Sequence, residues 1–129
     1  MEFHIDILTW CNDAVTNADG SLHIWRTWAY VEAPSLPVNF TGTAVFRARG
    51  RDLPDRFNLL LQLQTLDKKP LSDVLTLEVQ SGPVVGGWQI VAGYAQVNAV
   101  LPQSEQIFVL ETEDGEFSAE LPLPVVVKG

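Results

Sequence analysis

Few side chains in this sequence are of the types that carry out catalysis: two histidines, His4 and His23, and one cysteine, Cys11. Nucleophilic catalysis needs a histidine beside a nucleophile and a carboxylate that orients the histidine. Asp6 lies two residues after His4, so their side chains share one face of a predicted strand, and pairs of this kind are usually structural. Cys11 has no basic residue close in sequence, and we expect a small buried residue there. The sequence therefore predicts no catalytic residue and no enzyme.

Potential metal ligands are also few. Segment 12–20 contains two asparagines and two aspartates, whose oxygens could bind calcium. A calcium loop, however, ends in a bidentate glutamate, and none follows until Glu32. Side chain to backbone hydrogen bonds in a turn explain the same residues. The two histidines could share a metal only if 3–11 and 21–31 pair in register. With one cysteine and no phosphate-loop glycine spacing, we expect no metal site and no cofactor.

Three tryptophans are candidate binding residues. Alternation along a strand would point Trp25 and Trp28 to opposite faces, so one of them is exposed unless a bulge intervenes. Exposed aromatic rings on a β-sandwich bind sugar rings or other proteins. Trp88 is a further candidate of the same kind. Packing in the core explains each tryptophan individually as well.

Charged side chains form two further candidate surfaces. Arg47 and Arg49 share an outward strand face and could grip an anion together, although Asp52 and Asp55 are close enough in sequence to neutralise part of the site. The densest cluster is acidic and lies in a predicted hairpin; its members are Glu111, Glu113, Asp114 and Glu116. At a hairpin tip these carboxylates are solvated, whereas glycoside chemistry needs one of them in an apolar cleft. They either keep strand edges from aggregating or dock a basic partner.

The composition limits the classes of function that remain. The 129 residues suit a single domain, 1–129, and 47% of them are hydrophobic while only 19% are charged, which argues against a disordered chain. A net charge of −8 argues against nucleic acid as a partner. No apolar run approaches the roughly 20 residues that span a bilayer, and no basic segment with a following apolar run marks a signal peptide. We therefore expect a cytoplasmic protein with no membrane partner.

The dominant sequence period is two, which is typical of half-buried antiparallel strands. Segment 57–64 alternates leucines and phenylalanine with asparagine and glutamines, and 40–49 places Thr41, Thr43, Arg47 and Arg49 on its predicted solvent face. Turn residues separate the segments at 17–20, 66–70 and 113–116, and 81–87 is expected to be a looser connection. About seven to nine short strands without a helical period predict an all-β fold, a single antiparallel β-sandwich.

The order of these segments resembles a family of small uncharacterised bacterial proteins. The likeness is carried by Ile5–Ala14, by Asp19–Trp25 and by the prolines Pro34 and Pro37. Ser21 stands where that family usually has lysine, and 25–28 contains two tryptophans in place of its glycines. The resemblance implies an immunoglobulin-like β-sandwich and implies no activity.

We expect a non-catalytic protein-protein interaction or structural module that binds through a strand edge or a tryptophan-bearing face. The partner would be another protein or a second copy, which would give a homo-oligomer through strand edges. The alternative is a small-ligand or carbohydrate-binding module that uses exposed tryptophans. Fold class alone does not decide between them.

Overall fold

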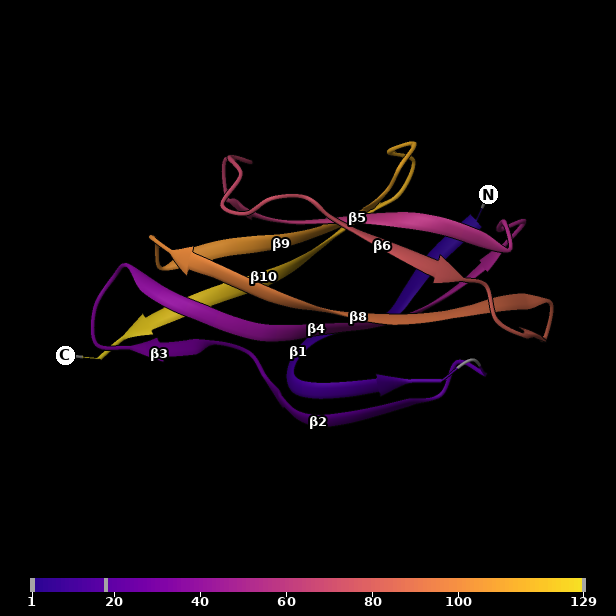
Figure 1. Ribbon diagram of the computed structural model, residues 1–129, viewed down its shortest axis with the longest axis horizontal. Helices are drawn as coiled ribbons and strands as arrows, with labels where there is room; N and C mark the ends of the chain where they lie inside the picture. The colour runs from indigo at the N-terminus through magenta and orange to yellow at the C-terminus, as the bar shows by residue number, and fades with distance from the viewer. Residues whose placement is uncertain (1, 18, 129) are drawn as a thin grey trace.

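Residues 2–17 and 19–128 are described by the computed structural model, and they form two five-stranded sheets that pack against each other (Figure 1). The first sheet has the order β2-β1-β4-β8-β7, and the second sheet has the order β3-β10-β9-β5-β6. The strands are β1 (Glu2–Thr16), β2 (Leu22–Trp28), β3 (Val31–Ala33), β4 (Val38–Arg51), β5 (Arg56–Thr65), β6 (Leu75–Gln80), β7 (Val84–Val85), β8 (Trp88–Leu101), β9 (Glu105–Thr112) and β10 (Ser118–Val127). The predicted all-β sandwich is confirmed, with ten strands in the described residues rather than seven to nine.

One strand pair departs from the expected antiparallel pattern. β3 runs parallel to β10, with Val31 opposite Val125. The amide of Lys128 donates a hydrogen bond to the carbonyl of Ala33 at 2.9 Å, and its ammonium donates to the Glu32 carboxylate at 2.9 Å. That hydrogen bond and the charge of Glu32 raise the pKa of Lys128. The pair joins the third strand of the chain to its last strand.

A β-bulge in β1 sets which of its side chains reach the core. The register with β4 shifts between Ile5 and Ile7, so one extra residue is inserted and the alternation changes phase. As a result, one core contains side chains from both sides of the bulge: Phe3 and Ile5 before it, and Leu8 and Trp10 after it. Without the bulge, an even-numbered and an odd-numbered set could not share one face.

The centre of the sandwich is aromatic. Trp10 is 1% exposed and stacks on Trp28, with 5.5 Å between ring centroids and 9° between the planes. Phe40 and Phe108 also contact the Trp10 ring. The indole Nε1 of Trp10 donates a hydrogen bond to the carbonyl of Pro122 at 2.9 Å, which ties β1 of the first sheet to β10 of the second. Buried Trp usually finds such a polar partner.

The β1–β2 hairpin folds back over the outer face of the first sheet. β1 pairs with β4 only as far as Cys11 and then continues to Thr16 beside β2. At the hairpin tip a Cβ on Gly20 would lie 2.2 Å from Cγ2 of Ile90 in β8, so the two segments touch. A second apolar cluster is buried beneath the hairpin, formed by Cys11, Ala14 and Val45 with Leu22 and Ile24. The expectation that Thr43 faces solvent is therefore wrong, because the residue is 3% exposed.

The turns follow the residues that permit positive φ. Gly86 (φ 59°) and Gly87 (φ 83°) connect β7 to β8 as a two-residue hairpin. The expected loose connection over 81–87 is thus wrong, since its second half is a tight turn. Gly115 (φ 72°) completes the predicted β9–β10 turn. In the β1–β2 turn, Ala18 lies outside the described residues, while Asp19 accepts hydrogen bonds from the amide and hydroxyl of Ser21 at 2.9 and 2.6 Å.

Candidate functional site

Most of β8 has a neighbouring strand on one side only. β4 pairs with β8 from Gln89 to Leu101, whereas β7 pairs only with Trp88 and Gln89. The next residue of β8, Ile90, donates its amide hydrogen to the carbonyl of Pro83 at 3.2 Å. The carbonyl of Ile90 accepts a hydrogen bond from the amide of Gly82 at 2.7 Å. Proline has no N–H, so the amide of Gly82 donates to Ile90 in place of Pro83. In the described residues no backbone hydrogen bond on this side of β8 lies beyond Ile90. The rest of β8 is an edge of the first sheet.

The direction of the free backbone groups on this edge follows from Ile90. Both of its polar backbone groups point away from β4, and the β4–β8 register contains no shift. In a regular antiparallel ladder the N–H and C=O groups of alternate residues point to the same side. The outward groups are therefore those of Ala92, Tyr94, Gln96, Asn98 and Val100. In the described residues no other backbone group pairs with them.

The sequence of β8 contains none of the usual devices that protect a strand edge. Its 14 residues include no charged side chain and no proline. Exposed edges are normally shortened, charged or bent, because unpaired N–H and C=O groups recruit further strands. The other three edge strands are short: β2 has 7 residues, β3 has 3 and β6 has 6. β8 is thus the long, uncharged and unprotected edge of the sandwich.

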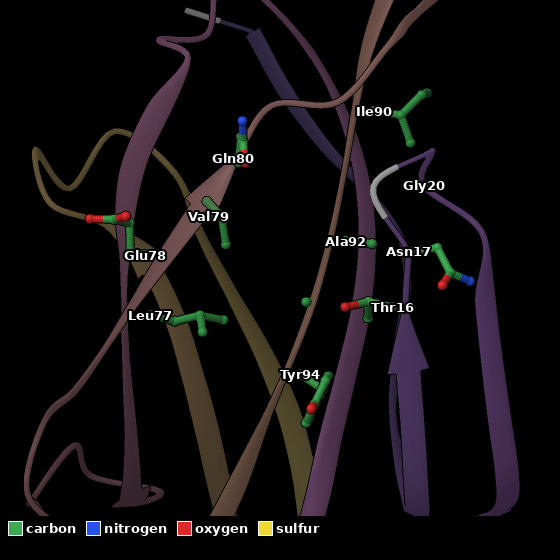
Figure 2. A pocket seen from close by; sticks show the side chains of 11 residues that line it. Thr16, Asn17, Gly20, Leu77, Glu78, Val79, Gln80, Ile90, Ala92 and Tyr94 are labelled. Carbon is green, nitrogen blue, oxygen red and sulfur yellow. The ribbon is translucent and has the colours of Figure 1, made fainter.

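A row of hollows runs along this edge, and we call it the β8-edge groove. The first hollow has a volume of about 440 Å³ and lies between the β1–β2 hairpin tip, β6 and β8 (Figure 2). Leu77 is turned toward β8, and the carboxylate of Glu78 is turned away from it (Figure 2). Tyr94, 43% exposed, forms part of the wall. The volume lies within the range of ligand pockets in proteins, about 300–1,000 Å³.

The groove continues toward the C-terminal end of β8. A second hollow of about 190 Å³ is lined by Ser72 and Asp73 from the segment before β6, by Leu75 at the start of β6, and by Gln96 and Asn98 on β8. A third hollow shares Ser72, Asp73 and Asn98 with the second. Among the described residues that line the three hollows, the charged ones are Glu78 and Asp73, and both are acidic. At the hairpin end Leu77, Ile90 and Tyr94 supply apolar surface among polar neighbours, and the Glu78 carboxylate is turned away from β8 (Figure 2). At the other end Asp73 supplies an acidic group beside Asn98.

The three candidate tryptophans occupy different environments. Trp28 is half-buried and packs on Trp10 in the core. Trp25 is 43% exposed on the hairpin, and the His23 ring stacks on it at 4.0 Å. Trp88 is half-buried, with the Arg51 guanidinium 3.8 Å from its ring centroid. Trp25 and Trp28 do lie in opposite environments, as the strand alternation predicts, and the structure does not bring the three rings together.

The predicted arginine pair is divided between two environments. Arg49 lies 4.9 Å from the Trp88 ring centroid and forms an ion pair with Asp6 at 3.4 Å. Arg47 lines a separate hollow with Asp6 and Asp19. Asp6 therefore pairs with an arginine, while His4 forms its contact with Glu2 at 3.1 Å. The His4–Asp6 pairing suggested by the sequence is wrong, because neighbouring side chains on β1 and β4 provide closer partners.

The acidic residues 111–116 form the end of the β9–β10 hairpin, as predicted. Asp114 accepts hydrogen bonds from the hydroxyl of Thr112 at 2.7 Å and from the amide of Glu116 at 3.0 Å. These hydrogen bonds lower the pKa of Asp114. Glu113 and Glu116 are exposed, and Glu111 is half-buried. Asp114 therefore shapes the turn, and its neighbours extend into solvent.

Cys11 is fully buried under the β1–β2 hairpin. Burial raises the pKa of its thiol, and the charge of Asp13 raises it further. A buried thiol of raised pKa is a poor nucleophile, since the reactive form is the thiolate. Among the residues that the structure describes, no three His, Cys, Asp or Glu side chains are grouped as a metal ion would require.

Comparison with protein-family models, with curated proteins and with solved structures gives no match to this chain. In the described part of the chain, no helix has the length and apolar character needed to cross a membrane. Sequence reasoning named a strand edge as a binding surface but did not identify β8. The available signal was the run Trp88–Leu101, which is long, uncharged and free of proline.

Proposed function

We propose that this chain is a non-catalytic protein-binding module, built on an immunoglobulin-like sandwich, that captures an extended segment by adding it as a strand beside β8. The observation that carries the proposal is the free edge, where the outward backbone groups of alternate residues from Ala92 to Val100 have no partner among the described residues. In strand addition, main-chain hydrogen bonds supply affinity and pockets for alternate side chains supply specificity.

The groove beside this edge supports the proposal. A strand paired with β8 would direct every second side chain toward the hollow of about 440 Å³. Its walls supply apolar contacts from Leu77 and Ile90 and an aromatic contact from Tyr94. The absence of charge along β8 means that an incoming backbone displaces no hydrated ion from the edge.

The test uses a proline variant of the edge. Gln96→Pro removes one outward N–H and leaves the ladder with β4 intact, whereas Gln96→Ala removes the same side chain and keeps the N–H. A displayed library of roughly ten-residue random peptides, long enough to span the edge at about 3.4 Å per residue, provides the probe. We expect selected peptides to bind the wild type and Gln96→Ala but not Gln96→Pro. Equal binding to the proline variant, or a library without binders, overturns the proposal.

Carbohydrate binding is the second candidate function, and it rests on Trp25. This indole is the most exposed of the three candidate tryptophans, and aromatic rings in such positions contact sugars. Saturable quenching of tryptophan fluorescence by one glycan of a panel, lost in Trp25→Ala, would support this function. A panel without any saturable response rejects it.

A further inference from the structure

We infer that the captured segment comes from a different protein and carries a bulky apolar anchor residue, followed about four residues away by a lysine or arginine. This inference rests on the proposed strand addition beside β8. It is carried by the polarity of the β8-edge groove, whose two ends offer different chemistry.

The anchor follows from the hairpin end of the groove. Leu77, Ile90 and Tyr94 line the hollow of about 440 Å³ there, together with the polar groups of Thr16 and Asn17. Figure 2 shows Leu77 and Tyr94 on the two sides of this hollow, from β6 and β8 respectively. Interfaces gain most of their energy from large side chains that fill such central pockets and exclude water. An aromatic or leucine side chain on the added strand fits this description.

The basic residue follows from the other end. Asp73 lines the second and third hollows, as does Asn98. Its side chain is exposed and has no ion-pair partner among the described residues. No cation lines any of the three hollows in the described part of the chain. The net charge of −8 adds a long-range attraction for a cationic segment. A lysine or arginine on the added strand would be drawn to Asp73.

The spacing comes from the strand geometry. Tyr94 marks the first hollow and Asn98 the second, four positions along β8. Strand residues rise by about 3.4 Å each, so the two subsites lie about 14 Å apart along the edge. Because side chains alternate, two ligand residues separated by an even number of positions face the same side. An anchor and a basic residue about four positions apart meet both subsites at once.

A second copy of this chain fits the groove poorly. If β8 of a second copy were the added strand, it would bring no basic residue, because Trp88–Leu101 contains no charge at all. Two molecules that each carry −8 also repel one another. The charge therefore favours a basic segment of another protein over self-pairing.

The experiment compares charge and anchor variants on peptides selected from the random library. Asp73→Asn should weaken binding of the selected basic peptides about two- to fivefold, as expected for an exposed ion pair, and should reduce the dependence of affinity on salt. Glu105→Gln, at an exposed position at the start of β9 that lines none of the three hollows, changes the net charge equally and should leave affinity unchanged. Tyr94→Ala should weaken binding about fivefold or more, and Tyr30→Ala, an equally exposed tyrosine outside the groove, should not.

The outcomes separate this inference from the proposed function. Selected peptides without the anchor and basic pair, or equal effects of Asp73→Asn and Glu105→Gln, overturn the inference. Strand addition itself still holds in that case if Gln96→Pro abolishes binding. A dimer seen by sedimentation and dispersed by Gln96→Pro would identify a second copy as the occupant and overturn the inference as well.

Discussion

Neighbouring prolines in β8 should have opposite effects on stability. Gln96 directs its N–H outward from the sheet, and Ala95 directs its N–H toward Ala44 in β4, as the alternation from Ile90 requires. Gln96→Pro should therefore leave the free energy of unfolding nearly unchanged. Ala95→Pro should lower it substantially, although the two substitutions are adjacent and introduce the same ring.

The size of the difference follows from burial. Ala44 is 4% exposed, so its carbonyl would be left buried without a donor in Ala95→Pro. An unsatisfied buried polar group costs about 1–3 kcal/mol, and the clash of the proline ring with the neighbouring strand adds to this. Gln96 is exposed and its side chain has no hydrogen-bond partner among the described residues, so its replacement should cost about 0.5 kcal/mol or less. In a domain of this size, each kcal/mol corresponds to roughly 4 °C in Tm.

Urea unfolding followed by tryptophan fluorescence measures both variants, because Trp10 and Trp28 form a buried stack that separates on unfolding. The slope of free energy against urea should stay constant across the variants, which would show that the same surface is exposed. Equal destabilisation by the two prolines, or a greater effect of Gln96→Pro, would refute the assigned edge. Amide hydrogen exchange gives a second readout, with fast exchange at even-numbered residues from 92 to 100 and slow exchange at odd-numbered ones.

Three further outcomes are expected. Gly93→Ala should destabilise the fold by about 1–3 kcal/mol in urea unfolding, because its Cβ would lie 2.7 Å from the Phe46 ring; an unchanged midpoint would mean that the ring can move freely. Trp10→Phe should cost about 2–4 kcal/mol by calorimetry, because the fully buried indole leaves a cavity and the carbonyl of Pro122 loses its donor. A loss below about 1 kcal/mol would contradict this. Asp114 has a lowered pKa in the folded state, so its ionised form stabilises the fold above pH 3.8 and this contribution is lost as the pH falls through the lowered value. The free energy of unfolding of Asp114→Asn, measured from pH 7 into acid, should therefore fall less below pH 3.8 than that of the wild type. Identical pH profiles for the two proteins would count against this role of Asp114.

Several strands of the second sheet could be predicted from the sequence because one of their faces is buried and the other is more exposed, although β9 is buried on both faces over 106–110. In β5, Leu59, Leu61 and Leu63 are buried, and Gln62 and Gln64 are only half-buried, as the period of two indicates. In such strands the alternation of apolar and polar residues indicates directly which side chains are buried. The all-β sandwich followed from several segments of this kind.

The first sheet was predicted less well because its outer face is partly covered. Thr43 and Val45 are buried by the β1–β2 hairpin, which folds over β4 from a distant part of the chain. The bulge beside Ile5 likewise shifts the phase of β1 in a way that alternation alone does not indicate. Both effects depend on tertiary contacts, so a local pattern could not reveal them.

The candidate site was the hardest part to predict, because its main components are backbone groups. Backbone N–H and C=O groups are the same at every residue except proline, so no residue type marks a free edge. The tryptophans and arginines were candidate binding residues because of their side-chain chemistry. In the structure, however, Trp28 packs in the core and Arg49 forms an ion pair with Asp6. What identifies the edge is Ile90, beyond which no backbone group of the described residues pairs with the outer side of β8.

The parallel pairing of β3 with β10 also affects how the chain can fold during its synthesis on the ribosome. β3 emerges early, whereas its partner residues Val125–Val127 emerge only after β4 to β9 have been translated. The carbonyl of Pro122, which accepts the hydrogen bond from the Trp10 indole, also belongs to β10. These two contacts can therefore form only after β10 has been translated. Until then the uncharged β8 is present in the nascent chain with its sandwich incomplete, and this interval is the one in which aggregation is most favoured.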